Sequence, residues 1–248
     1  MKKVMLITGA SRGIGAQTAK LAAQQGYQVA INYQSNEAAA RTVVNEIKKN
    51  GGQAQAFQGD VGDPEAVDRL FKAVDQAFGP LDVLVNNAGI FELFLVPQAT
   101  PECIERSFRA NVFSLFYCAK AAIERMSKDL GGKGGVIINV SSVAARIASI
   151  PGGSIYTASK AAVDGFNLSL AHEVGPQGIR VAGVRPGIIA TDMQAARGGI
   201  DKAAEFASSA TSLKRIGQPA EIAQTILWLA SDEASYVHGA MLDVSGGR

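Results

Sequence analysis

Cysteine and histidine are scarce in this chain of 248 residues, which contains Cys103, Cys118, His172 and His238 and no others. The two cysteines form no metal-like pair, and free thiols are typical of proteins kept in a reducing cytoplasm. The two histidines lie far apart in the sequence, which speaks against a histidine-based metal site or a Ser-His-Asp triad. We therefore expect a cytoplasmic protein without a bound metal.

Charge and hydrophobicity are not concentrated anywhere. The formal net charge is +2 and no cluster of lysine or arginine stands out, so no nucleic-acid partner is indicated. No apolar window approaches the length of a membrane span, and the short apolar run after Lys2-Lys3 is interrupted at Gly9, too early for a signal peptide. With 47% hydrophobic and 19% charged residues, the composition is that of an ordinary globular protein with ample apolar residues for a core.

The chain shows a regular alternation of predicted strands and helices. Apolar runs predict strands at Val4–Thr8, Tyr27–Asn32, Ala54–Gln58, Leu81–Val85, Val136–Val140, Ile179–Val184 and Ala240–Val244. Capping signals and apolar periodicity predict helices from the first glycine-rich turn to Gln25 and at Asn36–Asn50, Pro64–Phe78, Pro101 to about Leu130, Ser154–Val174 and Pro219–Ala230. This alternation is typical of an α/β Rossmann fold, with one domain spanning 1–248 and a doubly wound parallel sheet of about seven strands. Residues 188–217 are expected to form a mobile substrate lid above the sheet.

The turn after the first strand carries Gly9, Gly13 and Gly15 in the pattern Gly-x-x-x-Gly-x-Gly. Where a strand turns tightly into a helix, free backbone N–H groups and the positive end of the helix dipole can bind a pyrophosphate. Glycines also mark ordinary turns. At the start of an alternating chain, however, the pattern favours a dinucleotide site.

The segment after the second strand bears on the choice of cofactor. Sites for NAD often place an acidic residue there to hold the ribose hydroxyls, and Asn32-Tyr33-Gln34-Ser35-Asn36 contains none. Arg12 in the glycine turn suits a 2′-phosphate, with Ser35 available as a further donor. We therefore predict NADP(H) as the preferred cofactor, while Glu37 leaves NAD(H) possible.

Tyr156 and Lys160 lie four residues apart in a predicted helix, so their side chains share one helix face. A nearby ammonium lowers the pKa of a phenol from its usual value of about 10, and such a pair can move a proton on or off a substrate oxygen. The same spacing also fits a lysine on a solvated face. The position of the pair after the fifth predicted strand favours proton transfer.

These motifs occur together in the order and spacing of one known family. The chain resembles the classical short-chain dehydrogenases/reductases from Val4 to Gly247, through Thr8-Gly9-x-x-x-Gly13-Ile14-Gly15, Asn86-Asn87-Ala88-Gly89, Ser142, Tyr156-x-x-x-Lys160 and Pro186-Gly187. Within that family it is similar to bacterial enzymes of the glucose 1-dehydrogenase-like and 3-oxoacyl-acyl-carrier-protein-reductase-like types.

The resemblance implies catalytic roles for four residues. Tyr156 is the expected general acid/base, and Lys160 is expected to lower the pKa of Tyr156 and to hold the nicotinamide ribose. Ser142 is expected to hydrogen-bond the substrate oxygen, and Asn111 to hold a water in a proton relay to Lys160. Ser141 is an alternative to Ser142, and Asn111 can instead bond a local carbonyl.

The resemblance also implies cofactor contacts, in which Tyr156 and Lys160 take part. Asp60 and Val61 are expected to border the adenine, although Asp60 can instead cap the following turn. The other expected contacts are Gly9, Ser11, Arg12, Gly13, Ile14, Gly15, Asn32, Tyr33, Ser35, Asn87, Ala88, Gly89, Pro186, Gly187, Ile189 and Thr191.

The substrate is less clearly indicated. Apolar residues in the loops after the fourth and fifth strands are consistent with an apolar pocket, and no charged substrate is indicated. We expect a sugar, polyol or ketone that is interconverted between carbonyl and alcohol. A 3-oxoacyl-acyl-carrier-protein reductase is the alternative, but of two positions where basic residues would meet the acidic carrier, one is Lys133 and the other is Gln177.

Two other classes remain open, together with the state of assembly. A non-catalytic NADP(H)-binding sensor or scaffold is disfavoured by the complete motif set, and a nucleotide-sugar epimerase by the short C-terminal part. The resemblance implies a homotetramer, with interfaces expected at small residues along the predicted helices at 101–130 and 154–174 and at the apolar last strand. The same residues can instead belong to the monomer core.

Overall fold

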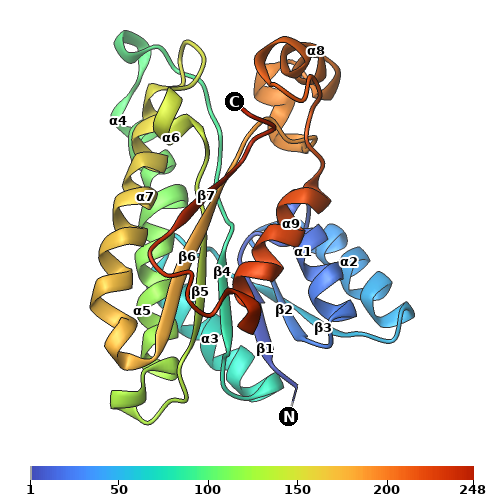
Figure 1. The fold of residues 1–248 in the computed structure, drawn as a ribbon, viewed down its shortest axis with the longest axis vertical. Coiled ribbons are helices and arrows are strands. Elements are labelled where there is room, and N and C mark those ends of the chain that lie inside the picture. The colour runs from blue at the N-terminus through green and yellow to red at the C-terminus, as the bar shows by residue number, and fades with distance from the viewer. Residues whose placement is uncertain (1) are drawn as a thin grey trace.

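Seven strands form one fully parallel sheet in the computed structural model, which describes residues 2–248 (Figure 1). The strands are β1 (Val4–Ile7), β2 (Gln28–Tyr33), β3 (Gln53–Gln58), β4 (Val83–Asn86), β5 (Gly135–Val140), β6 (Ile179–Pro186) and β7 (Met241–Val244). Their order across the sheet is β3-β2-β1-β4-β5-β6-β7, so the winding reverses between β1 and β4. In doubly wound sheets, ligands bind at this reversal, beyond the carboxyl ends of the strands.

Helices cover both faces of the sheet. The α-helices are α1 (Gly13–Gln24), α2 (Glu37–Lys49), α3 (Pro64–Phe78), α4 (Pro101–Phe108), α5 (Ser114–Met126), α6 (Ala144–Ile147), α7 (Ser154–Val174), α8 (Ile200–Ala210) and α9 (Pro219–Ala230). The shorter elements are the 3-10 segments η1 (Val96–Gln98), η3 (Lys128–Leu130), η4 (Gly175–Gln177), η5 (Asp192–Arg197) and η6 (Asp232–Ala234), and the π-helical turn η2 (Arg109–Phe113). Helices α1, α2 and α9 pack on one face, and α3, α5 and α7 on the other (Figure 1).

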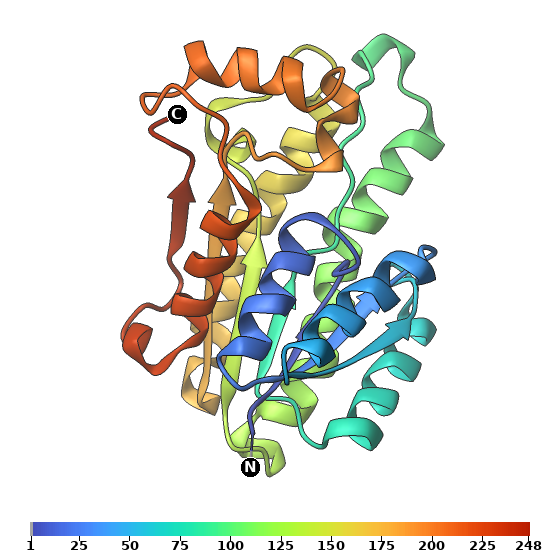
Figure 2. The same ribbon diagram turned by 90° about the vertical axis from the view of Figure 1, so that its right-hand side faces the viewer.

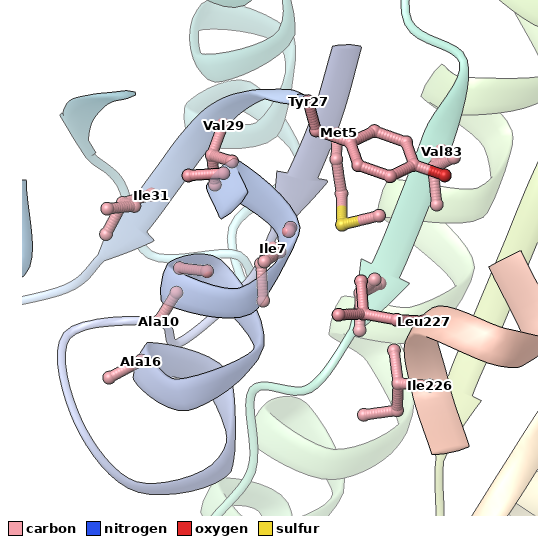
Figure 3. Close-up of a cluster of buried hydrophobic side chains, with 14 of the residues drawn as sticks. Met5, Ile7, Ala10, Ala16, Tyr27, Val29, Ile31, Val83, Ile226 and Leu227 are labelled. Atoms are coloured by element: carbon pink, nitrogen blue, oxygen red, sulfur yellow. The ribbon is translucent and has the colours of Figure 1, made fainter. Parts of the chain in front are cut away.

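Strand β1 shows how the two faces are filled. Met5 and Ile7 are buried with residues of α1, α2 and α9, whereas Val4 and Leu6 are buried with residues of α3, α5 and α7. Figure 3 shows part of the first cluster, where side chains of β1, β2, β4 and α9 meet. Because successive strand residues point to opposite faces and both faces are covered, the strand reads as a continuous apolar run.

The predicted single-domain α/β Rossmann fold is confirmed, and the predicted helices at 64–78, 154–174 and 219–230 coincide with α3, α7 and α9. The predicted helical segment from Pro101 to about Leu130 is present, but it is not one regular α-helix. Helix α4 ends at Phe108, the π-helical turn η2 follows, and α5 ends at Met126, whose carbonyl accepts the N–H of Gly134 as the chain turns into β5.

The segment 188–217 folds into η5 and α8. It has a small apolar cluster of its own, formed by Ile188, Ala203 and Ala207. Helix α8 lies across the end of the sheet to which the strand arrows point (Figure 2). Among residues 2–248, no helix combines the length and the apolar character that crossing a bilayer requires.

Candidate active site

The turn between β1 and α1 leaves three backbone donors free. The N–H groups of Gly13, Ile14 and Gly15, in the first turn of α1, have no acceptor within residues 2–248. Gly9 and Gly13 have φ angles of 62° and 58°, and a Cβ on Gly15 would lie 2.6 Å from Nδ2 of Asn87. Glycine is therefore required for this shape. A pyrophosphate fits such a set of donors at a helix N-terminus.

Thr8 and Asn87 hold this turn against the end of β4. Thr8 Oγ1 accepts hydrogen bonds from the N–H groups of Asn87 and Ala88 at 3.0 and 2.9 Å. Asn87 Nδ2 donates to the carbonyls of Thr8 and Gly9 at 2.9 and 3.2 Å. The predicted contacts Asn87 and Ala88 thus lie directly beside the glycine turn.

Two predicted cofactor contacts are engaged by the protein itself. Asn32 is buried, its Oδ1 accepts from the N–H of Gly9 at 3.2 Å, and its Nδ2 donates to the carbonyl of Gly59 at 3.0 Å. Asn32 therefore joins the glycine turn to the end of β3. Asp60 Oδ1 accepts from the N–H of Gly62 at 2.9 Å, which is the capping role considered as the alternative.

The remaining residues near the predicted adenosine end differ in exposure. Tyr33 and Val61 are buried in the core, whereas Ser35 is exposed and Ser11 half-buried. The side chain of Arg12 is 69% exposed and its Nη1 lies 3.9 Å from Oδ2 of Asp192. An ion pair with this exposure and separation stabilises little, so Arg12 is free to turn toward a phosphate.

The predicted contacts after β6 border the glycine turn from the other side. A Cβ on Gly13 would lie 3.4 Å from Cγ2 of Thr191. A Cβ on Gly187 would lie 2.7 Å from Cα of Ser245, so the chain passes too close for a side chain. Pro186 and Ile189 are buried, and the carbonyl of Ile189 accepts from Nε2 of Gln194 at 2.8 Å.

Tyr156 lies in the first turn of α7, where its ring packs edge-on against Phe91 with 4.7 Å between the ring centroids. Burial raises the pKa of its hydroxyl, while hydrogen bonding with the Ser142 side chain and the positive charge of Arg197 lower that pKa. The phenol therefore keeps its proton at neutral pH and can donate it. Ser141 donates to the carbonyl of Lys160 at 3.1 Å, so Ser142 is the serine directed at Tyr156.

Lys160 is buried one helical turn after Tyr156. Its Nζ donates to the carbonyl of Val140 at 2.9 Å and lies 5.9 Å from the centroid of the Tyr156 ring. Burial lowers the pKa of Lys160 from 10.5 to about 8, a shift that the charge of Asp164 opposes. The ammonium is directed at Val140, and burial is the largest cause of the raised pKa of Tyr156, so the effect of Lys160 on that pKa stays a prediction.

Asn111 lies in the π-helical turn η2, a local irregularity that often marks functional positions. Its Oδ1 accepts from the N–H of Ile90 at 2.8 Å, and its Nδ2 donates to the carbonyl of Ile90 and to Oγ of Ser159, both at 3.0 Å. The local carbonyl bond considered as the alternative is therefore present. A Cβ on Gly89 would lie 2.8 Å from Asn111 Oδ1 and 3.4 Å from Lys160 Nζ, so these three residues converge.

The structure adds two residues that the sequence did not single out, Ser159 and Arg197, and it gives a contact role to Thr8, which the sequence presented only as part of the glycine motif. Ser159 Oγ donates to the carbonyl of Tyr156 at 2.7 Å and accepts from Asn111, a role that its spacing of three residues from Tyr156 would have suggested. Arg197 comes from the segment 188–217 and has no local sequence signal. Within residues 2–248, no group of three or more side chains is arranged to hold a metal.

A turn that fits a pyrophosphate, next to a buried phenol that can donate a proton, is the arrangement of a dinucleotide-dependent oxidoreductase. The family model described as enoyl-(acyl carrier protein) reductase matches residues 9–248. The chain belongs to the short-chain dehydrogenase/reductase family, whose members bind a nicotinamide cofactor.

Three relatives illustrate this membership. The chain is 48% identical, over 99% of both chains, to the uncharacterized oxidoreductase YgfF of Escherichia coli K12. It is 40% identical to the 3-oxoacyl-(acyl carrier protein) reductase FabG of Staphylococcus aureus Mu50, over 100% of this chain and 98% of that one. The structure of a short chain dehydrogenase from Burkholderia cenocepacia J2315 in complex with NADP matches with a TM-score of 0.90 at 34% identity, over 99% of this chain and 97% of that one.

Proposed function

We propose that the protein is an NADP(H)-dependent oxidoreductase that interconverts a carbonyl and an alcohol on a small molecule, such as a ketone, sugar or polyol. This proposal rests on the convergence of Ser142, Tyr156 and Lys160 beside Gly89. Gly89 belongs to the loop that packs on the glycine turn. The exposed Arg12 and the complex of the Burkholderia relative with NADP support the choice of NADP(H).

The side chains have separate tasks in the proposed reaction. The bound cofactor supplies or accepts the hydride. Tyr156, whose raised pKa keeps the phenol neutral, gives its proton to the carbonyl oxygen in reduction and removes it in oxidation, while Ser142 orients the same oxygen. Lys160, with a pKa of about 8, exchanges protons readily near neutral pH and stabilises the phenolate that forms on Tyr156. Asn111 fixes the loop around Ile90 and with it the position of Gly89.

Replacing Tyr156 by Phe tests this mechanism. A positioned general acid contributes about 10²- to 10⁴-fold to rate, so we expect a loss of that size in kcat with NADPH binding retained. Tyr236→Phe is the matched control, because Tyr236 is fully exposed. A panel of ketones, aldehydes and sugars, followed by NADPH consumption, gives the measurement. Turnover unchanged in Tyr156→Phe contradicts the mechanism, and tight NADPH binding without turnover of any panel member favours a sensor or scaffold.

A carrier-bound acyl substrate is the second candidate, favoured by the 40% identity to FabG of Staphylococcus aureus. The exposed Lys133 is the residue available to meet an acidic carrier. If the carrier is recognised, Lys133→Glu raises KM for a 3-oxoacyl carrier protein but leaves KM for the corresponding small thioester unchanged. Equal KM changes for both substrates count against this candidate.

We also propose a cytoplasmic homotetramer. Ala119 and Ala121, two of the small residues considered as interface residues, are buried in the monomer core, so they do not support a subunit interface. Support comes instead from Phe113, Phe116 and Leu168 on η2, α5 and α7, which are 40 to 56% exposed. Light scattering of the protein and of Phe116→Glu measures the assembly state, and a monomeric parent protein overturns this proposal.

A further inference from the structure

Arg197, the last residue of η5, reaches the candidate active site from the segment 188–217. Its guanidinium carbon lies 5.1 Å from the centroid of the Phe91 ring. The same ring packs against Tyr156, with 4.7 Å between the two ring centroids. The charge of Arg197 is close enough to lower the pKa of the Tyr156 hydroxyl. Phe91 is therefore flanked by a cation and by the proposed proton donor.

Among the described residues, the guanidinium of Arg197 lacks an ionic or hydrogen-bonding partner. Within residues 2–248 it has neither a carboxylate nor a hydrogen-bond acceptor, and its Nε is fully buried without one. The side chain of Arg248 is equally without an acceptor in this part of the chain. It stacks on Phe206, with 5.1 Å from its guanidinium carbon to the ring centroid. Burial lowers the pKa of Arg197, and the charge of Arg248 lowers it further.

The other arginines differ in this respect. Each of them contacts a carboxylate or a backbone carbonyl within the described residues: Arg12, Arg41, Arg69, Arg106, Arg109, Arg125, Arg146, Arg180, Arg185 and Arg215. Two half-buried cations without an anion are unfavourable, and an anionic ligand would relieve both their mutual repulsion and the unmet hydrogen-bonding capacity.

We infer that Arg197, assisted by Arg248, binds an anionic oxygen group of the substrate, a carboxylate or a phosphate, and so determines which carbonyl compounds the enzyme accepts. The planar guanidinium matches the geometry of both groups. Phe91, between the guanidinium and the phenol, provides an apolar wall for the carbon chain that joins the anion to the carbonyl. This inference rests on the proposed function and narrows the expected substrates to anionic carbonyl compounds. The sequence alone had indicated no charged substrate.

Matched substrate pairs test the inference. The pairs are 4-oxopentanoate with its methyl ester, and dihydroxyacetone phosphate with dihydroxyacetone. We expect the parent protein to prefer the anionic member of one pair. Because Arg197→Gln removes a charge-assisted hydrogen bond, it should lose about 10- to 100-fold more kcat/KM for that anionic substrate than for its neutral partner. Arg197→Lys should recover part of the loss. Arg69→Gln, which removes an exposed arginine on α3, is the charge-matched control.

Binding measured without turnover keeps this test separate from the proposed function. Calorimetric titration of pentanoate and of inorganic phosphate into the NADP-loaded protein should show binding of one anion that Arg197→Gln abolishes. If neither anion binds, or if the anionic and neutral substrates lose kcat/KM equally, the inference is wrong. A tenfold weaker affinity of Arg197→Gln for NADPH would overturn it too, by assigning the guanidinium to the cofactor. Anion binding that depends on Arg197, together with no reduction of any carbonyl compound, would support the anion site and refute the proposed function.

Discussion

The buried ammonium of Lys160 is expected to destabilise the folded protein at neutral pH. Burial lowers its pKa from 10.5 to about 8, so the unfolded chain binds this proton more tightly than the folded one. Stability rises with pH wherever the unfolded state binds more protons. The destabilisation is therefore fully present below pH 8 and disappears as the pH rises toward 10.5. It amounts to about 3 kcal/mol at pH 7.

Lys160→Met removes this titration while keeping an unbranched side chain. It also removes the hydrogen bond to the Val140 carbonyl, and leaving that buried acceptor unpaired costs about 1 to 3 kcal/mol. At pH 7 the two effects oppose each other, so we expect the variant to lie between equal stability and about 2 kcal/mol greater stability than the parent. The pH dependence is the sharper prediction. Between pH 7 and pH 9.5 the parent should gain about 2 kcal/mol relative to Lys160→Met.

Urea unfolding of both proteins at the two pH values, at one protein concentration, measures this change. The comparison between the proteins cancels the contributions of other titrating groups, such as Cys118, whose pKa is raised by burial. If the stability difference stays constant within about 0.5 kcal/mol across this range, Lys160 titrates with nearly its ordinary pKa and the reasoning is refuted. Lys160→Met should in addition lose turnover, because the proposed proton supply to Tyr156 is removed.

Three further predictions follow from the contacts of the site. Gly89→Ala places a Cβ 2.8 Å from Asn111 Oδ1, so kcat should fall more than about tenfold while the midpoint of urea unfolding changes little. An unchanged kcat contradicts the proposed convergence. Arg12→Ala should weaken NADPH about tenfold in fluorescence titrations and leave NADH nearly unchanged, and equal losses for both cofactors would exclude a 2′-phosphate contact. Asp164→Asn removes the charge that raises the pKa of Lys160, so the limb of the kcat–pH profile that reports Lys160 should move to lower pH, whereas an unmoved limb would exclude that influence.

Local sequence determined the elements and the order of the fold. Strand β1 was recognisable because both faces of the sheet are covered, which makes Val4–Ile7 uniformly apolar. Helix α3 begins as expected because the Asp63 side chain accepts from the N–H of Glu65 and Pro64 occupies the first helical position. The glycine turn was recognisable for a related reason, since Gly9 and Gly13 have φ angles that other residues rarely adopt.

Tertiary structure decided the partners of the polar side chains and the state of the buried charges. The sequence predicted Asn32 as a cofactor contact without indicating the partners of its amide. These are Gly9 and Gly59, which approach it only when β1, β2 and β3 pair. The direction of the pKa shift of Tyr156 depends on how many apolar atoms displace water from it, which no residue spacing encodes.

Arg197 shows the same limit most clearly. It lies 41 positions after Tyr156 in the sequence and reaches the site only because the segment after β6 folds back over the ends of the strands. Hydrogen bonding and desolvation depend on neighbours in space, so the sequence by itself determined which chemistry the chain can support, whereas the folded arrangement decided which atoms are free to perform it.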